Sequence, residues 1–151
     1  MADTVPEQIE QEIVIAASPE RVWAVLTEAE HLGKGSPDVT AEVDPRPGGS
    51  IVLKWTEYGT FLFRIERVEP PRFFSFRWAR PTDAEPRPGN STLVEFTLIP
   101  EGSGTRLRVV ESGFRDLDLS DEEKAAWANG NVDGWAGQLS EIRDYAARLA
   151  A

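Results

Sequence analysis

The chain begins with an alternating pattern of apolar and polar residues and then changes to a helical period. In residues 9–17 (IEQEIVIAA), Ile9, Ile13 and Ile15 are separated by even numbers of positions, so they share one face of an extended chain, which predicts a strand. The next segment, SPERVWAVLTEAEHL, predicts a helix with Ser18 as its N-cap and Pro19 at its first position. We therefore expect a strand followed directly by a helix.

After this helix the hydrophobic period becomes two. Short turns rich in Pro and Gly separate the alternating segments VTAEV, SIVLKWTEY, TFLFRIERVE, RFFSFRWA, TLVEFTLI and TRLRVVESGF, which predicts an antiparallel meander. The segment DLSDEEKAAW then begins a last, long helix, with Ser120 as a plausible cap and acidic residues in the first turn. This order favours one α+β domain over 1–151, a curved antiparallel sheet of about seven strands around a long C-terminal helix, with one or two short helices after the first strand.

Alternation also assigns the aromatic residues to one side of the sheet. Arg64 and Arg77, for example, lie on the opposite face from their aromatic neighbours, so the aromatic face is expected to point inward. The inward aromatic residues of the strands include Trp55, Phe61, Phe63, Phe76, Trp78 and Phe96. On the last helix, at about 100° per residue, the inward side carries Trp127, Asn131, Trp135 and Gln138.

Three polar residues share this inward side. Glu111 continues the apolar row of the last strand, so it either lies at the rim or needs a buried partner. Asn131 and Gln138 lie within the apolar stripe of the helix, where an unpartnered amide costs about 1–3 kcal/mol. They must therefore meet backbone, water, Glu111 or a ligand. Gly134, at the edge of the stripe, predicts that the helix backbone comes close to another group, whereas Gly137 faces away.

Composition and charge limit the partners and the catalytic groups that the protein can use. The net charge of −10 argues against nucleic acid and anionic membranes as partners, and the absence of cysteine excludes disulfides and thiolate catalysis. The N-terminal residues lack an apolar signal core and no run approaches a membrane span, so we expect a cytoplasmic protein. His31, the single histidine, is expected on the surface, and no metal or other cofactor is expected. Glu111 is the best acid–base candidate.

The order of these segments resembles the helix-grip domain of the SRPBCC (START/Bet v 1-like) superfamily. The closer resemblance is to its branch of activator of heat-shock protein 90 ATPase homologue-like proteins. It covers nearly the whole chain in family order, through SPERVWAVLTEAEHL, DVTAEVDPRPGGSIVL, RIERVEPPRFFSFRW, STLVEFTLIPEGSGTRLRVVESGF and GWAGQLSEIRDYAARL. The resemblance implies an apolar ligand between the sheet and the last helix. The segment HLGKGSPD lacks tryptophans that relatives often carry there, which predicts a more open lid.

Three functional hypotheses follow. The first is non-enzymatic binding of an apolar or amphipathic small molecule in a cavity, with the inward aromatic residues as walls and Glu111, Asn131 and Gln138 as polar anchors. The same aromatic residues could instead be ordinary core. The second is interaction with a chaperone, as the branch name implies, although a short acidic domain is more typical of bacterial members. The third is a cyclase or hydrolase that uses Glu111. The sequence leaves open whether the protein is a monomer or a homodimer.

Overall fold

The computed structural model describes residues 5–32, 39–57, 59–79 and 84–150. Within these residues seven strands form one antiparallel sheet, accompanied by three α-helices and one short 3-10 helix. In chain order the elements are β1 (Gln8–Ile15), α1 (Pro19–Thr27), α2 (Ala29–Leu32), β2 (Val39–Val43), β3 (Ser50–Trp55), β4 (Gly59–Glu69), β5 (Phe73–Ala79), β6 (Ser91–Glu101), β7 (Gly104–Ser112), η1 (Phe114–Asp116) and α3 (Asp121–Ala150).

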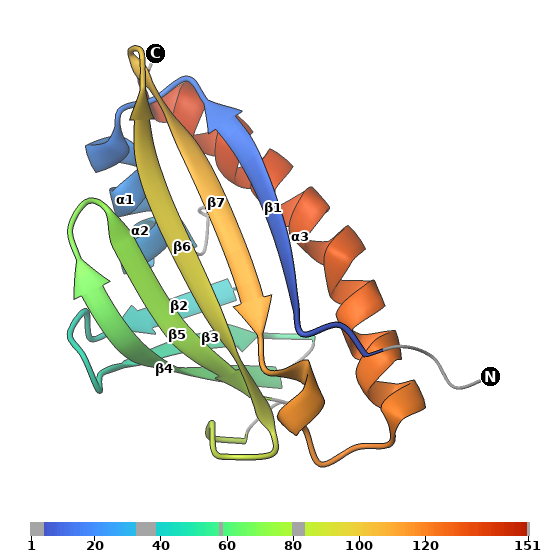
Figure 1. Ribbon diagram of the computed structural model, residues 1–151. Coiled ribbons are helices and arrows are strands. Elements are labelled where there is room, and N and C mark those ends of the chain that lie inside the picture. Colours follow the sequence, from blue (N-terminus) through green and yellow to red (C-terminus); the bar gives the residue numbers. More distant parts are fainter. Residues whose placement is uncertain (1–4, 33–38, 58, 80–83, 151) are drawn as a thin grey trace.

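The strands lie in the order β1-β7-β6-β5-β4-β3-β2, so β1 pairs with β7 and every other pair is a hairpin. The sheet curves strongly, because β2, β3 and β4 run across the direction of β6 and β7 (Figure 1). In the same view α1 and α2 lie behind the sheet, and α3 runs alongside and behind β1 (Figure 1). The predicted helix-grip architecture is confirmed.

Both predicted helix caps are present. The Ser18 hydroxyl accepts a hydrogen bond of 3.2 Å from the backbone N–H of Arg21, and Pro19 is the first residue of α1. At α3, the hydroxyl of Ser120 accepts from the backbone N–H of Glu123 at 3.1 Å and donates to that residue's carboxylate at 2.9 Å. Each helix therefore begins where a side chain satisfies one of its free N–H groups.

The segment after β1 forms two short helices, as predicted. The first of them ends at Thr27, because Glu28 adopts an extended conformation with ψ of 132° and separates α1 from α2. The Thr27 hydroxyl donates to the backbone carbonyl of Trp23 at 2.8 Å, a bond that is known to bend helices. The break redirects α2.

The buried side chains form two clusters. The larger lies between the inner face of the sheet and helices α1 and α3, and it includes the fully buried Ile15, Val22 and Leu107. A smaller cluster consists of Phe114, Leu117, Trp127 and Ala128, with Val5 and Ile9 against it. Gly113, with φ of +98°, makes the turn after β7 that brings Phe114 into this second cluster.

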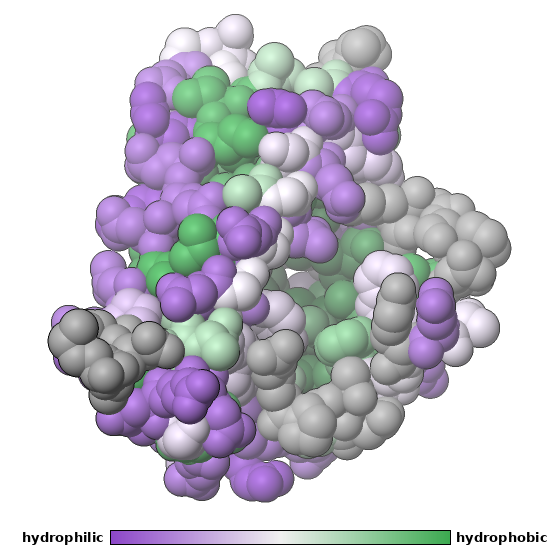
Figure 2. All heavy atoms as spheres, turned by 90° about the vertical axis from the view of Figure 1, so that its right-hand side faces the viewer, coloured by the Kyte–Doolittle hydropathy of each residue, from purple (hydrophilic) through white to green (hydrophobic). Residues whose placement is uncertain are grey.

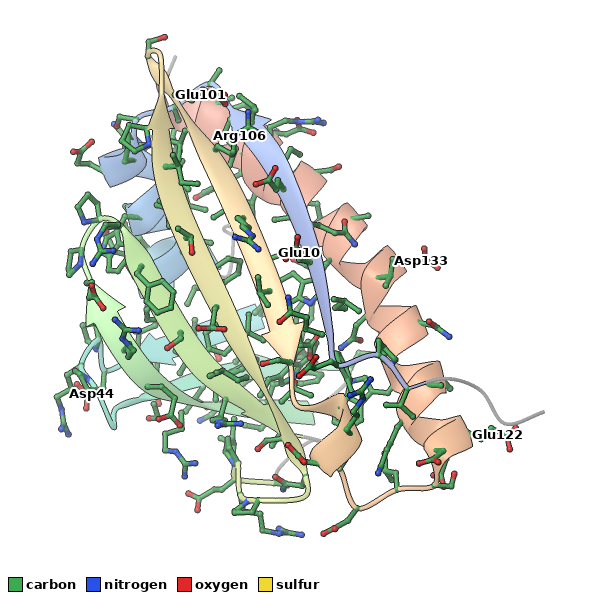
Figure 3. The ribbon with its side chains drawn as sticks, viewed as in Figure 1. Glu10, Asp44, Glu101, Arg106, Glu122 and Asp133 are labelled. Carbon is green, nitrogen blue, oxygen red and sulfur yellow. The ribbon has the colours of Figure 1, made fainter. Side chains whose placement is uncertain are left out.

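The outer face of the sheet is charged. Arg106 of β7 bonds to Glu101 at 2.5 Å and to Glu12 at 3.2 Å, and Figure 3 shows Glu10, Glu101 and Arg106 along this face. The hydrogen bond that the Arg106 guanidinium donates to Glu101 raises the pKa of Arg106. Such exposed pairs contribute little to stability. No helix within the described ranges is both long and apolar enough to cross a membrane.

Candidate functional site

A cavity of 540 Å³ lies between the sheet and α3. Its lining comes from α1, α2, strands β2 to β6 and α3, and it is largely apolar. Figure 2 shows a hollow with hydrophobic atoms at its bottom on the face that it presents. The volume lies in the range of about 300–1,000 Å³ that is usual for small-molecule sites.

Aromatic and aliphatic side chains share the apolar wall of the cavity, and the aromatic rings pack against one another. Trp135 of α3 meets Phe96 edge-on, with ring centroids 5.7 Å apart, and meets Trp78 in the same manner at 6.1 Å. Phe63 and Phe76 form another edge-on pair at 5.4 Å. Because the rings contact one another as well as the cavity, the wall does not depend on a ligand for its arrangement.

A buried carboxylate lies behind this wall. Glu111 of β7 has no exposed surface, and its Oε1 accepts hydrogen bonds from Asn131 Nδ2 at 2.8 Å and from Trp135 Nε1 at 2.9 Å. Its Oε2 accepts from the hydroxyl of Thr92, also fully buried, at 2.5 Å. Of the two alternatives for Glu111, the structure shows the buried residue with partners. All three donors are neutral, so they satisfy the carboxylate without an ion pair.

This network also settles the orientation of one amide. Oε1 of Glu111 accepts hydrogen bonds here, from the indole N–H of Trp135 as well, so the NH2 group of Asn131 faces Glu111. Its Oδ1 is then the atom left over for other contacts. Asn131 lines the cavity, as does Trp135, so two residues of the wall are held in place from behind by one carboxylate.

The structure brings nine of the predicted site residues together around the cavity. These are Trp55, Phe61, Phe63, Phe76, Trp78, Phe96, Asn131, Trp135 and Gln138. Trp55 is 37% exposed and Gln138 is also exposed, so both lie where the cavity meets solvent. The amide of Gln138 therefore has no need of a buried partner.

Two predicted site residues do not line the cavity. Glu111 contacts it only through Asn131 and Trp135. Trp127 packs in the second cluster with Phe114 and Leu117. Both point to the predicted side of their elements, yet neither forms part of the cavity surface.

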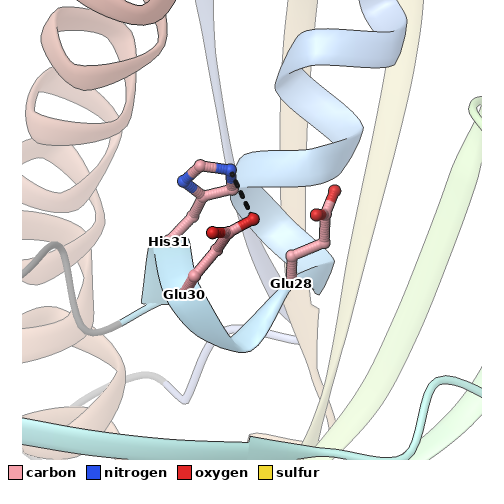
Figure 4. Close-up of side chains that lie close together, drawn as sticks. All are labelled: Glu28, Glu30 and His31. Carbon is pink, nitrogen blue, oxygen red and sulfur yellow. Dashed lines mark ion pairs between the residues drawn. The ribbon is translucent and has the colours of Figure 1, made fainter.

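The sequence interpretation missed His31, which lines the cavity and has a side chain only 14% exposed. Its Nδ1 lies 2.9 Å from the Tyr145 hydroxyl, and its Nε2 lies 3.7 Å from a carboxylate oxygen of Glu30 (Figure 4). Ligand atoms of Glu28, Glu30 and His31 lie within 4.8 Å of one another, close enough to share a cation, but both acidic residues are exposed. The expectation that His31 is a surface residue is wrong, because the break at Glu28 turns α2 toward α3.

The interpretation of Gly134 also needs correction. A Cβ atom at Gly134 would meet no atom within 4 Å, so no part of the described protein requires a close approach there. Gly134 instead lines the cavity and faces open space. Gly137 has equally open surroundings but does not line the cavity. Figure 3 shows Asp133, next to Gly134, on the outer side of α3. The predicted lid, residues 33–38, lies outside the described residues.

A curved antiparallel sheet that closes on a long C-terminal helix, with an aromatic cavity between them, defines the helix-grip class of α+β domains. Comparison with known families gives the more specific identity. The family model described as "Activator of Hsp90 ATPase homolog 1-like protein" matches residues 16–147, and the chain belongs to this family. The resemblance seen in the sequence is thereby confirmed.

Solved structures share the fold. A crystal structure of a protein from Mesorhizobium loti is 24% identical, with a TM-score of 0.73, over 93% of this chain and 97% of that chain. The solution structure of the Aha1 dimer from Colwellia psychrerythraea is 22% identical, with a TM-score of 0.67, over 91% and 93%. A protein of unknown function from Staphylococcus aureus is 13% identical, with a TM-score of 0.75, over 92% of each chain. No curated protein matches the sequence.

Proposed function

We propose that this protein binds an apolar or amphipathic small molecule in the cavity between the sheet and α3, without catalysing a reaction. The observation that carries the proposal is the cavity itself: 540 Å³ of space with a mostly apolar wall that includes several aromatic rings. Polar lining residues, among them His31, Gln138 and Glu141, gather on α2 and α3. An apolar interior with a few polar groups is the usual composition of a small-molecule site.

The size of the cavity is consistent with useful affinity. A ligand that buries roughly 350 Å² of apolar surface gains about 9 kcal/mol at 25 cal/mol per Å², before the cost of association. Micromolar binding corresponds to about 8 kcal/mol. Association costs at least about 4 kcal/mol, so apolar burial alone leaves at most about 5 kcal/mol, and polar contacts must supply the rest of a micromolar affinity.

Glu111 gives little support to the cyclase or hydrolase hypothesis. Its two oxygens are occupied by three donors, and its side chain is fully buried behind the wall. A general acid or base must reach the substrate at hydrogen-bond distance or through one water. We therefore assign Glu111 a structural role in the cavity wall.

The test compares two matched glycines of α3. The neutral fluorescent probe N-phenyl-1-naphthylamine should bind the unmodified protein and Gly137→Phe equally, because Gly137 lies away from the cavity. Gly134→Phe should bind at least about tenfold more weakly, since the new ring occupies open space at the cavity. Equal binding by both variants, or no binding by the unmodified protein, would refute the proposal.

The family description supports a second candidate, activation of the chaperone ATPase. The expected result is capture of the chaperone by the tagged protein together with a higher ATPase rate. A cavity-blocking Gly134→Phe variant that keeps this stimulation would separate the chaperone role from ligand binding.

We also propose a cytoplasmic location and a monomer or homodimer. The relative from Colwellia psychrerythraea was solved as a dimer, and sedimentation at several concentrations would decide between these states.

A further inference from the structure

We infer that the cavity selects an amphipathic amine, that is, a molecule with an apolar body and a protonated amino group. This inference rests on the proposed function. The first observation is the sign of the charges around the cavity: Glu141 lines it, and Glu111 lies directly behind Asn131 and Trp135. No lysine or arginine lines it within the part of the chain that the structure describes. The net charge of −10 acts in the same direction.

The second observation is that the donors of Asn131 and Trp135 are already used. The indole N–H of Trp135 and the NH2 group of Asn131 both point to Glu111. The indole N–H of Trp78 has no hydrogen-bond partner among the described residues, but its nitrogen is buried within the wall and does not reach the cavity surface. Oδ1 of Asn131, in contrast, receives no hydrogen bond from the described residues. Beside Trp135 the free polar atom is thus an acceptor, which suits an ammonium group and not a carboxylate, whereas the amide of Gln138 at the cavity mouth can both donate and accept.

The aromatic wall favours a cation for a third reason. The face of an aromatic ring carries negative electrostatic potential, and it attracts ammonium groups most strongly when water is excluded. Trp55, Trp78 and Trp135 all line the cavity, and tryptophan is the most effective of the aromatic residues in this respect. A ligand with an apolar body and an ammonium group can therefore lose the hydration shell of that group here at a lower free-energy cost than an anionic ligand would pay.

An anion would lack a counter-charge in this cavity. His31 is the one described lining residue that can become cationic, and its two ring nitrogens already face Tyr145 and the carboxylate of Glu30. A buried ionised group without a partner is strongly disfavoured. The lining thus discriminates against fatty acids, although their chains would fit an apolar cavity equally well.

Three ligands of equal chain length test the inference: decylamine, decan-1-ol and decanoate, titrated calorimetrically at about pH 7.5. We expect decylammonium to bind at least about tenfold more tightly than decanoate, with decan-1-ol between them. Decanoate binding as tightly as decylammonium would overturn the inference but leave the proposed function intact. If none of the three binds, both the inference and the proposed function are wrong.

Charge-neutralising variants separate the local effect from the overall charge. Glu111→Gln keeps the shape and can still accept from Asn131 and Trp135. It should weaken decylammonium binding at least about threefold more than it weakens decan-1-ol binding. If this variant does not fold, the exposed Glu141→Gln provides the same test. Glu95→Gln, on the outer face of β6, is the matched control; an equal loss there would show a general charge effect and overturn the inference.

Discussion

Trp135 of α3 donates a hydrogen bond of 2.9 Å from its indole nitrogen to Oε1 of Glu111 in β7. The same oxygen accepts from Asn131 one turn earlier in the helix, and the second oxygen accepts from Thr92 of β6. A single buried carboxylate therefore links two neighbouring strands to the C-terminal helix. The link lies behind the cavity wall, so the stability of the fold and the shape of the cavity depend on the same residue.

The substitution Glu111→Leu should destabilise the protein by about 2–3 kcal/mol. It removes the acceptor of three hydrogen bonds and leaves the fully buried Thr92 hydroxyl without its partner. Asn131 and Trp135 lose less, because they line the cavity and can reach water there. Urea unfolding followed by circular dichroism measures the change.

The control for this prediction is Glu95→Leu. Glu95 lies on the outer face of β6, where substitutions usually change stability by less than about 0.5 kcal/mol. If Glu111→Leu costs no more than Glu95→Leu, the buried network contributes nothing to stability.

Trp127 and Trp135 lie on the same side of α3 but should behave differently when each is changed to Phe. Trp127 packs in the second cluster, so Trp127→Phe should cost about 1–3 kcal/mol of stability and leave the affinity for N-phenyl-1-naphthylamine unchanged. Trp135→Phe removes both wall surface and the bond to Glu111, and it should weaken probe binding about tenfold. Probe titration and urea unfolding of both variants provide the measurements. A loss of affinity in Trp127→Phe would mean that the two clusters are coupled.

The cap of α3 yields a prediction about stability alone. Ser120→Ala removes the hydroxyl that accepts from the Glu123 N–H, and a lost N-cap costs about 1 kcal/mol. The start of α3 lies near the second cluster, so probe affinity should stay constant. Thermal unfolding of Ser120→Ala beside Ser120→Asp checks this, because Asp also caps helices and should restore most of the stability.

The sheet and its aromatic face were predictable because successive side chains of a strand point to opposite faces, so every second residue lies on the same face. Phe63 and Phe76 lie inward because Arg64 and Arg77, their neighbours, lie outward, and the register pairs these strands as the pattern requires. The same alternation turned Glu111 inward. The alternation along the strand could not identify the partners of Glu111, because these depend on how α3 crosses β7. Asn131 and Trp135 lie 20 and 24 positions after Glu111 in the sequence.

Helical periodicity gave the direction of Trp127 but not its position along the axis. Trp135 lies eight positions after Trp127, which at a rise of about 1.5 Å per residue is about 12 Å along the helix axis. That distance carries Trp127 past the cavity into the second cluster. His31 was missed for a related reason: the extended conformation at Glu28 reorients α2, and no residue pattern marked that break. Local patterns assign faces, whereas the extent of a cavity depends on tertiary packing.

The glycines of α3 should be replaceable by alanine with a gain in stability. Gly134 and Gly137 are both exposed, and a Cβ at either would meet nothing within 4 Å. Each substitution should therefore stabilise the protein by about 0.5–1 kcal/mol through helix propensity. Thermal unfolding measures the gain. Only Gly134 lines the cavity, so a methyl group there should lower probe affinity slightly while Gly137→Ala leaves it unchanged. If Gly134→Ala stabilises the fold but weakens binding, the glycine serves the cavity and not the helix. Equal affinity in both alanine variants would show that the cavity has room to spare beside α3.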